Sequence, residues 1–215
     1  MSNVILNGDF SSGFNYWDNG VGGEAFTLDA AQAKGISYST STTLRTYQML
    51  QDFILTGAVD TGTITVWCKW LAYYGSISHG SNRFIVALDK PDLSSVTLLD
   101  TTKTGISGNG NLLNGVDIKS HLTQTGTYWL SLTLITVSGM SENPDPPPAY
   151  SYGVSSGWYD NIAIDIAYPA GTNMKINIGD AFKDVDEIKI NIGGTWKTVT
   201  KAQVNIGDTW KTVFE

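Results

Sequence analysis

Cysteine and histidine are nearly absent from this chain of 215 residues, and their scarcity limits the available chemistry. The single cysteine, Cys68, excludes an internal disulfide and any zinc site built from several thiolates. It lies inside the segment TITVWCKWLAYY, which favours a buried free thiol. The two histidines, His79 and His121, lie in Gly/Ser-rich and connecting segments without a nucleophile motif beside them. We therefore predict that the chain is not an enzyme.

Charge is also scarce, at 15% of the residues, and the formal net charge is −7. Residues 1–173 hold fourteen acidic and seven basic residues, whereas residues 174–215 hold six of each. An acidic body repels phosphate backbones and anionic lipid surfaces, so neither nucleic acid nor a membrane is an expected partner. No apolar run approaches the roughly 20 residues that span a bilayer. The opening MSNVILNGDF lacks the pattern of a signal peptide, from which we expect synthesis in a cytoplasm.

Helical periodicity is also nearly absent from the sequence. Short apolar or alternating runs occur instead, such as FIVALD and TYWLSLTLITV, each bounded by Gly, Ser, Asn, Asp or Pro. This pattern predicts an all-β sandwich. Residues 104–115 and 141–157, which are rich in Gly, Pro, Ser and Asn, are predicted to be loops. A linker-like composition at residues 169–173 separates a domain of residues 1–168 from a tail of residues 174–215.

The opening NVILNGDFSSGFNYW and the closing WYDNIAIDI of the first domain resemble the galactose-binding-like jelly roll of carbohydrate-binding modules. The matching residues are Asn7, Gly8, Asp9, Phe10, Gly13 and Trp17 at the start and Asp160, Asn161 and Ile162 at the end. The resemblance covers about the first 168 residues and implies a jelly-roll β-sandwich. We expect Phe10 and Trp17 to lie in the core and Gly8 to supply a positive φ at a sharp turn.

The same resemblance implies a structural calcium ion where the first loop meets the last strand. Asp9 and Asp160 are its candidate ligands, with Glu24 as a further one. Calcium takes six to eight oxygen ligands, and Ser11 stands where the family has a glutamate that would supply one. In the alternative interpretation, Asp9 caps a turn and Asp160 accepts hydrogen bonds from nearby amides.

Aromatic residues crowd one predicted strand and its end, and the resemblance implies that some of them bind a sugar. The candidate residues for contact with a glycan are Trp70, Tyr73, Tyr74 and Trp158. Strand residues alternate, so Trp67 and Trp70 face opposite ways and at most one of them belongs to the core. Trp158 and Tyr159 form a second opposed pair. The alternative is that these aromatic side chains simply fill the sandwich.

Three near-copies of one 14-residue unit end the chain, with KINIG at 175–179 and 189–193 and QVNIG at 203–207. Each unit is predicted to be a β-hairpin, so that the tail is a small meander of hairpins. A two-residue turn would pair Ile192 with Thr195, whereas a three-residue turn with a bulge would pair Ile192 with Trp196. We favour the second because it gathers the apolar side chains on one face, with Lys197 on the other. The expected assembly interface consists of Ile176, Ile178, Ile190, Ile192, Trp196, Ile206 and Trp210.

The INIGGTWKTV and VNIGDTWKTV units resemble C-terminal repeats of bacteriophage tail, fibre and other minor virion proteins. This resemblance implies a non-enzymatic decoration, head-fibre or tail protein at the virion surface. Its sandwich would hold host or environmental glycans, while its repeats bind other virion proteins or further copies of the chain. Trimers are common among virion appendages, so a homo-oligomer such as a trimer is expected. The alternative is a carbohydrate-binding module of a polysaccharide-degrading enzyme system.

Overall fold

The computed structural model of the chain describes residues 2–39, 43–73, 80–104, 106–138, 140–141, 151–168, 175–178, 181–184, 189–199, 202–206 and 209–214. The chain divides into two compact units, Met1–Ala167 and Tyr168–Glu215. The first unit contains β1 (Ser2–Asn3), β2 (Asp18–Asn19), β3 (Thr27–Leu28), β4 (Ala33–Ser39), β5 (Thr43–Leu55), β6 (Thr61–Tyr73), β7 (Gly80–Asp89), β8 (Ser95–Thr104), β9 (Ser107–Asp117), the short 3-10 helix η1 (Lys119–His121), β10 (Gly126–Ser138), β11 (Met140–Ser141) and β12 (Ser151–Ala167). The second unit contains β13 (Lys175–Ile178), β14 (Ala181–Asp184), β15 (Lys189–Ile192), β16 (Thr195–Thr198), β17 (Ala202–Ile206) and β18 (Thr209–Phe214).

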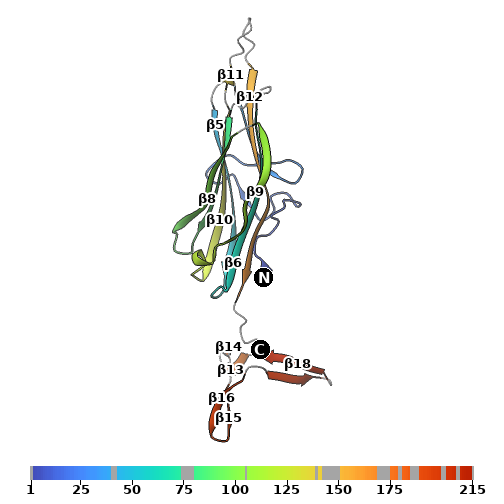
Figure 1. The fold of residues 1–215 in the computed structure, drawn as a ribbon, viewed down its shortest axis with the longest axis vertical. Coiled ribbons are helices and arrows are strands. Elements are labelled where there is room, and N and C mark those ends of the chain that lie inside the picture. Colours follow the sequence, from blue (N-terminus) through green and yellow to red (C-terminus); the bar gives the residue numbers. More distant parts are fainter. Residues whose placement is uncertain are drawn as a thin grey trace. The chain divides into compact units, whose positions relative to one another are not determined.

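The first unit is a sandwich of two antiparallel sheets (Figure 1). The first sheet has the strand order β3-β4-β12-β6-β9, and β1 and β11 also pair with β12. The second sheet has the order β2-β5-β10-β7-β8. The predicted all-β sandwich is therefore confirmed. Within the described part of the chain, no helix is long and apolar enough to cross a membrane.

Alternate residues of the long central strands build the core between the sheets. On β6 the buried side chains include Ile64, Val66 and Cys68, and on β10 they include Leu132 and Leu134. This alternation follows from the two-residue period of a strand, which the apolar runs of the sequence share. Burial raises the pKa of the Cys68 thiol to about 11, so it stays protonated and unreactive at neutral pH.

The first loop closes one end of the core, as the sequence predicts. Phe10 and Trp17 are 1% and 6% exposed, and their ring centroids lie 5.5 Å apart. The expected positive φ of Gly8 is wrong, because Asn7 and Phe10 have the positive values of 52° and 51° instead. Gly8 is required for another reason. An added Cβ would lie 1.9 Å from the carbonyl oxygen of Ile162, whose N–H donates to the Gly8 carbonyl at 3.0 Å.

Both segments predicted to be loops contain strand. Residues 107–117 form β9, which pairs with β6 from Leu71↔Ser107 to Thr63↔Asp117, and residues 151–157 begin β12. The sequence conceals β9 because its pairing depends on the backbone rather than on an apolar pattern, and because register shifts interrupt it between Ile64 and Trp67. The rest of the second segment, residues 142–150, lies outside the described residues.

The middle hairpin of the second unit, β15–β16, has a two-residue turn, so the predicted three-residue turn is wrong. Ile192 pairs with Thr195, and Trp196 pairs with Asn191. Trp196 therefore lies on the face opposite Ile192, and Lys197 shares the isoleucine face. The cause is local, since Gly193 and Gly194 have φ values of 63° and 85°, as in a type I′ turn, and such turns match the strand twist. The other two hairpins have the same register, with pairs 178↔181 and 206↔209.

Candidate functional site

The outward face of the first sheet brings together side chains from four strands. On β6 the inward residues are the even-numbered ones, so Trp67, Lys69 and Leu71 face outward. The register places Lys69 beside Trp158 of β12 and beside Asn109 of β9. It also places Lys34 of β4 on the other side of Trp158. These cross-strand neighbours share one face of the sheet, which we call the sheet-A face.

Trp158 lies at the centre of the sheet-A face and is covered by two lysines. The Nζ atoms of Lys34 and Lys69 lie 5.1 Å and 4.8 Å from its ring centroid, within cation–π range. The indole Nε1 donates to Oδ2 of Asp29 at 2.9 Å, and the Lys34 ammonium lies 3.2 Å from the same oxygen. Trp158 is consequently only 4% exposed, although it points away from the core.

The Asp29 carboxylate holds this cluster in one arrangement. The hydrogen bond from Trp158, followed by that from Lys34, lowers the pKa of Asp29 below its ordinary value. The carboxylate is therefore ionised at neutral pH, and its ion pair is with Lys34. The stabilisation that Asp29 provides through these contacts is fully present above the ordinary carboxyl pKa. It is lost as the pH falls through the lower pKa that Asp29 has in the folded protein.

A pocket of about 410 Å³ opens on this face between β6, β9 and β12. Its lining residues are Lys69, Trp70, Leu71, Ser107, Gly108, Asn109 and Trp158. The volume lies within the range of about 300–1,000 Å³ that is usual for small-ligand sites. Lys69, Ser107 and Asn109 are exposed, so an ammonium, a hydroxyl and a carboxamide border an apolar floor. The pocket can thus offer hydrogen-bond donors and acceptors beside an aromatic ring.

Ser107 and Asn109 were not expected at the site because residues 104–115 were predicted to be a loop, and Lys69 of β6 was not expected because the candidate residues were all aromatic. The signal that could have indicated Ser107 and Asn109 is the alternation of polar residues with glycine in SGNGN, residues 107–111. These polar residues lie on the same face of the sheet as Lys69 on the neighbouring strand β6. Trp67, which alternation places on the face opposite Trp70, is half-buried on the sheet-A face and lies opposite Asp160 and Asn111.

Of the four sequence-predicted aromatic residues, Trp70 and Trp158 both line this pocket, although their side chains lie on opposite faces of the first sheet. Trp70 points inward and packs against the core. Its ring lies so close to Gly108 that an added Cβ there would be 2.2 Å from Cζ2, and Lys103 Nζ lies 5.4 Å from the ring centroid. Tyr73 ends β6, but its side chain and all of Tyr74 lie outside the described residues. The outward indole on β6 is therefore Trp67.

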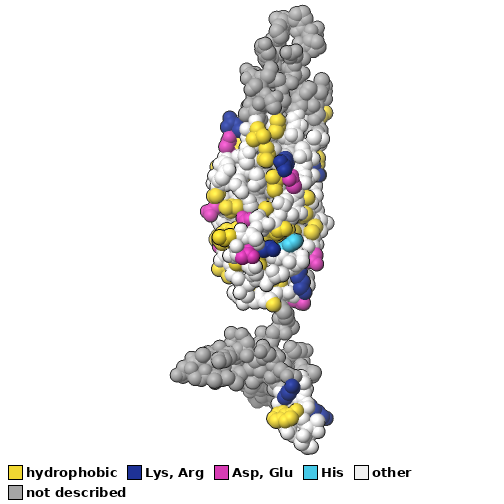
Figure 2. Space-filling view, turned by 90° about the vertical axis from the view of Figure 1, so that its left-hand side faces the viewer, with side chains coloured by type: hydrophobic (Ala, Val, Ile, Leu, Met, Phe, Trp, Pro, Cys, Tyr) yellow, Lys and Arg dark blue, Asp and Glu magenta, His cyan; other side chains and the backbone are white. Residues whose placement is uncertain are grey.

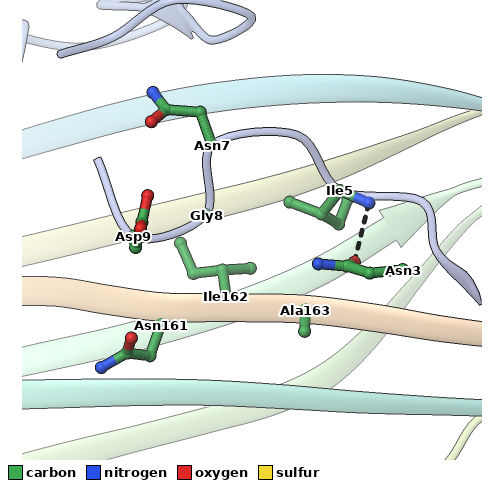
Figure 3. A pocket seen from close by; sticks show the side chains of 8 residues that line it. All are labelled: Asn3, Ile5, Asn7, Gly8, Asp9, Asn161, Ile162 and Ala163. Carbon is green, nitrogen blue, oxygen red and sulfur yellow. Dashed lines mark hydrogen bonds between the residues drawn. The ribbon is translucent and has the colours of Figure 1, made fainter. Parts of the chain in front are cut away.

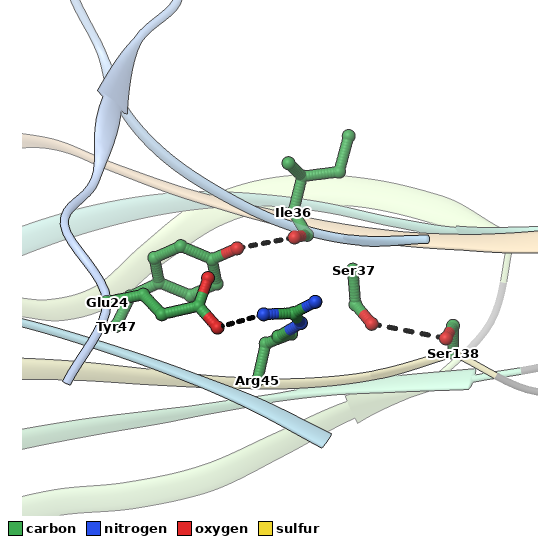
Figure 4. A network of polar contacts seen from close by, with 6 residues as sticks. All are labelled: Glu24, Ile36, Ser37, Arg45, Tyr47 and Ser138. Carbon is green, nitrogen blue, oxygen red and sulfur yellow. Dashed lines mark hydrogen bonds and ion pairs between the residues drawn. The ribbon is translucent and has the colours of Figure 1, made fainter. Parts of the chain in front are cut away.

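The candidate calcium ligands have other partners. The Asp9 carboxylate accepts hydrogen bonds from the Ser11 N–H and hydroxyl, and these lower its pKa. The Glu24 carboxylate pairs with Arg45 beside the Tyr47 hydroxyl, which donates to the Ile36 carbonyl (Figure 4).

Asp160 accepts hydrogen bonds from the Gln32 carboxamide at 2.9 Å and from the Asn161 N–H at 2.7 Å. Among the described residues, no group of three or more His, Cys, Asp or Glu side chains could hold a metal ion. The contacts of Asp9 and Asp160 match the alternative interpretation, in which they bind local amides.

A second pocket, of about 370 Å³, lies where the first loop meets β12. Asp9 and Asn161 line it, but their side chains point in opposite directions, and Ile162 lies beneath Gly8 (Figure 3). Asn3 and Asn7 line it too, and their side-chain oxygens accept backbone N–H groups. Most of its polar groups are therefore already used to hold the loop.

In the view of Figure 2, the acidic and basic side chains of the first unit are scattered among uncharged ones and form no patch of one sign. Arg83 and Asp100 form a bidentate ion pair across β7 and β8.

No protein-family model and no curated protein matches this chain. Among solved structures, it is similar to TmCBM61 in complex with β-1,4-galactotriose, with 10% identity, a TM-score of 0.44 and coverage of 78% of this chain and 100% of that one. It is similar to a CBM4 structure with 12% identity, a TM-score of 0.34 and coverage of 74% and 99%. It is also similar to the enzymatically active domain of tailspike protein 4 of bacteriophage CBA120, with 10% identity, a TM-score of 0.31 and coverage of 77% and 21%. Likenesses this distant carry no argument about function, which must come from the site.

Proposed function

We propose that this chain is a non-enzymatic glycan-binding protein whose binding site is the sheet-A face. The observation that carries the proposal is the pocket in which Trp158 is bordered by Lys69, Ser107 and Asn109. A sugar ring has an apolar side that packs on aromatic and aliphatic surface, and hydroxyl groups that require donors and acceptors. Trp67, half-buried two residues from Lys69 on the same face, supplies an accessible indole beside the pocket.

The composition of the pocket favours binding over catalysis. Lys69 is the one ionisable side chain among its lining residues. Glycoside hydrolysis generally uses two carboxyl groups that flank the scissile bond, one of them as a general acid. The Asp29 and Asp160 carboxylates on this face are instead occupied by hydrogen bonds from Trp158 and Gln32.

Trp67→Ala should weaken binding of the glycan by about tenfold or more, because burial of a large aromatic side chain contributes about 1.5–3 kcal/mol. The ligand is first selected on a broad glycan array, and its Kd is then measured by calorimetry. The matched control is Trp129→Ala, since Trp129 is half-buried on the outward face of the second sheet, opposite Asp52 and Asp89. Absence of binding on the array, or equal loss in both variants, would contradict the assignment.

We further propose that the protein belongs to a phage particle, at the virion surface, where its repeats bind other virion proteins or further copies of the chain. The resemblance of the repeats supports this role, as does the surface of the middle hairpin. Ile190, Ile192 and Trp196 are 51%, 55% and 67% exposed on an isolated two-stranded hairpin, which is at best marginally stable in water. The alternative is a module of a polysaccharide-degrading system, and mass spectrometry of purified particles distinguishes the two by detecting or missing the chain.

Shortening the chain to residues 1–168 should convert an oligomer into a species with the mass of one subunit, because the apolar hairpin surface is removed. Light scattering after size-exclusion chromatography measures the mass. In the full chain, Trp196→Ala should weaken the oligomer, whereas Leu93→Ala should not, since Leu93 is an 84% exposed apolar residue of the first unit. If the shortened chain kept the same number of subunits as the full chain, the repeats would not be what assembles the oligomer.

A further inference from the structure

The charge of the pocket is opposite to that of the chain. The chain carries a formal charge of −7, yet Lys69 alone among the pocket-lining residues is ionisable, and it is exposed. The Lys34 ammonium lies on the same indole, 5.1 Å from its centroid. The pocket is therefore a locally basic site on a chain whose net charge is negative.

The Lys69 ammonium has no ion-pair partner within the part of the chain that the structure describes. Among the described residues, ion pairs within 4 Å join Lys34 to Asp29, Arg45 to Glu24, Arg83 to Asp100 and Lys119 to Asp60, and none involves Lys69. Lys69 acts on the Asp29 carboxylate only from a distance, as the least of the influences that lower the pKa of Asp29. Asp29 is already held by Trp158 and Lys34. The cluster of two lysines and one aspartate thus retains one positive charge at the pocket.

The Lys69 ammonium is positioned by its contact with Trp158, with Nζ 4.8 Å from the ring centroid. An ammonium held in this way loses less side-chain freedom when it binds a ligand than a freely rotating one does. Ser107 and Asn109 beside it supply neutral groups for hydroxyls. One sugar unit with an anionic substituent matches this combination of one cation, two neutral polar groups and an apolar floor.

We propose that the ligand of the sheet-A face is an acidic glycan, whose carboxylate or sulfate group binds the Lys69 ammonium. This inference rests on the proposed glycan-binding function and names its ligand class. Because the protein as a whole is acidic, nonspecific attraction to a polyanion is disfavoured, and binding requires this local site. Screening by salt should weaken the binding of the acidic glycan.

The test compares Kd values of the full chain for oligogalacturonate, a sulfated galactan oligosaccharide and a neutral β-1,4-galactan oligosaccharide of the same length, at low and high salt. Lys69→Met keeps an apolar stem over Trp158 and removes the charge, whereas Lys69→Arg keeps the charge. Lys119→Met is the matched control, because it removes one exposed lysine charge outside the pocket. Melting temperatures of all variants show that they remain folded.

We expect at least one acidic oligosaccharide to bind more tightly than the neutral one. Lys69→Met should weaken this binding by about tenfold or more, as for a lost charge-assisted hydrogen bond, while Lys69→Arg and Lys119→Met should stay within about twofold. Preference for the carboxylated or for the sulfated ligand identifies the anion. Equal or tighter binding of the neutral oligosaccharide, or indifference to Lys69→Met, would overturn the acidic ligand and leave glycan binding intact. Failure of all three oligosaccharides, together with a blank glycan array, would overturn both.

Discussion

Gly8→Ala should lower the free energy of unfolding of the first unit by about 3 kcal/mol, at the upper end of overpacking effects. The added Cβ would lie 1.9 Å from the carbonyl oxygen and 2.9 Å from the carbonyl carbon of Ile162. These are backbone atoms of β12, so no side-chain rotation can relieve the clash. The first loop would have to move away, and the hydrogen bond from the Ile162 N–H to the Gly8 carbonyl would be lost.

Thermal and urea unfolding of the two proteins measure this loss, which should appear as a decrease in melting temperature of roughly 10 °C. Gly57→Ala is the matched control, because an added Cβ there has no heavy atom within 4 Å. That substitution should change stability by no more than about 0.5 kcal/mol. Equal stability of the two variants would show that the first loop does not pack on β12 as described.

Tyr159→Ala should destabilise the first unit by about 4 kcal/mol, because it empties a large site in the middle of the sandwich. Tyr159 is fully buried, and its ring lies edge-on to Phe84 with centroids 5.3 Å apart. Its hydroxyl donates to the Thr133 carbonyl at 2.7 Å, with the Ile85 carbonyl 3.1 Å away. Burial raises the pKa of this hydroxyl well above its ordinary value, so it remains a donor at neutral pH.

Tyr159→Phe separates the two contributions, since it removes the hydroxyl and keeps the ring. It should cost about 1 kcal/mol, the usual net value of one hydrogen bond. Calorimetry or urea titration of both variants provides the comparison. If the phenylalanine variant lost as much stability as the alanine variant, the hydroxyl and not the packing of the ring would be the main contribution.

The opposed tryptophans of β6 show how far local sequence can predict a site. Alternation correctly places Trp67 and Trp70 on opposite faces, but it does not say which face is covered. That depends on Phe84, Leu132 and other residues of the second sheet, which are distant in the chain. Alternation therefore leaves open which of the two tryptophans lies in the core, and it does not single out Lys69.

The surroundings of Trp158 depend on the tertiary structure for the same reason. Asp29 and Lys34 lie more than 120 residues from Trp158 in the sequence, and only the pairing of β4 with β12 brings them together. The hairpins show the converse case. In the middle hairpin, Gly193 and Gly194 indicate a two-residue turn, whereas burial of the apolar side chains favours a three-residue turn with a bulge. The observed register follows the turn residues.

The sequence by itself determined the all-β class, the buried Phe10 and Trp17, the alternation of faces along each strand, and the hairpin form of the repeats. These properties depend on two-residue periodicity and turn residues, which act over a few positions. The tertiary structure alone decided that residues 107–117 are a strand, that Gly8 is needed for close approach to Ile162, and that Lys69 lines a pocket beside Trp158. Each of these depends on backbone pairing between segments far apart in the chain, and the pattern within one segment does not specify its pairing partner.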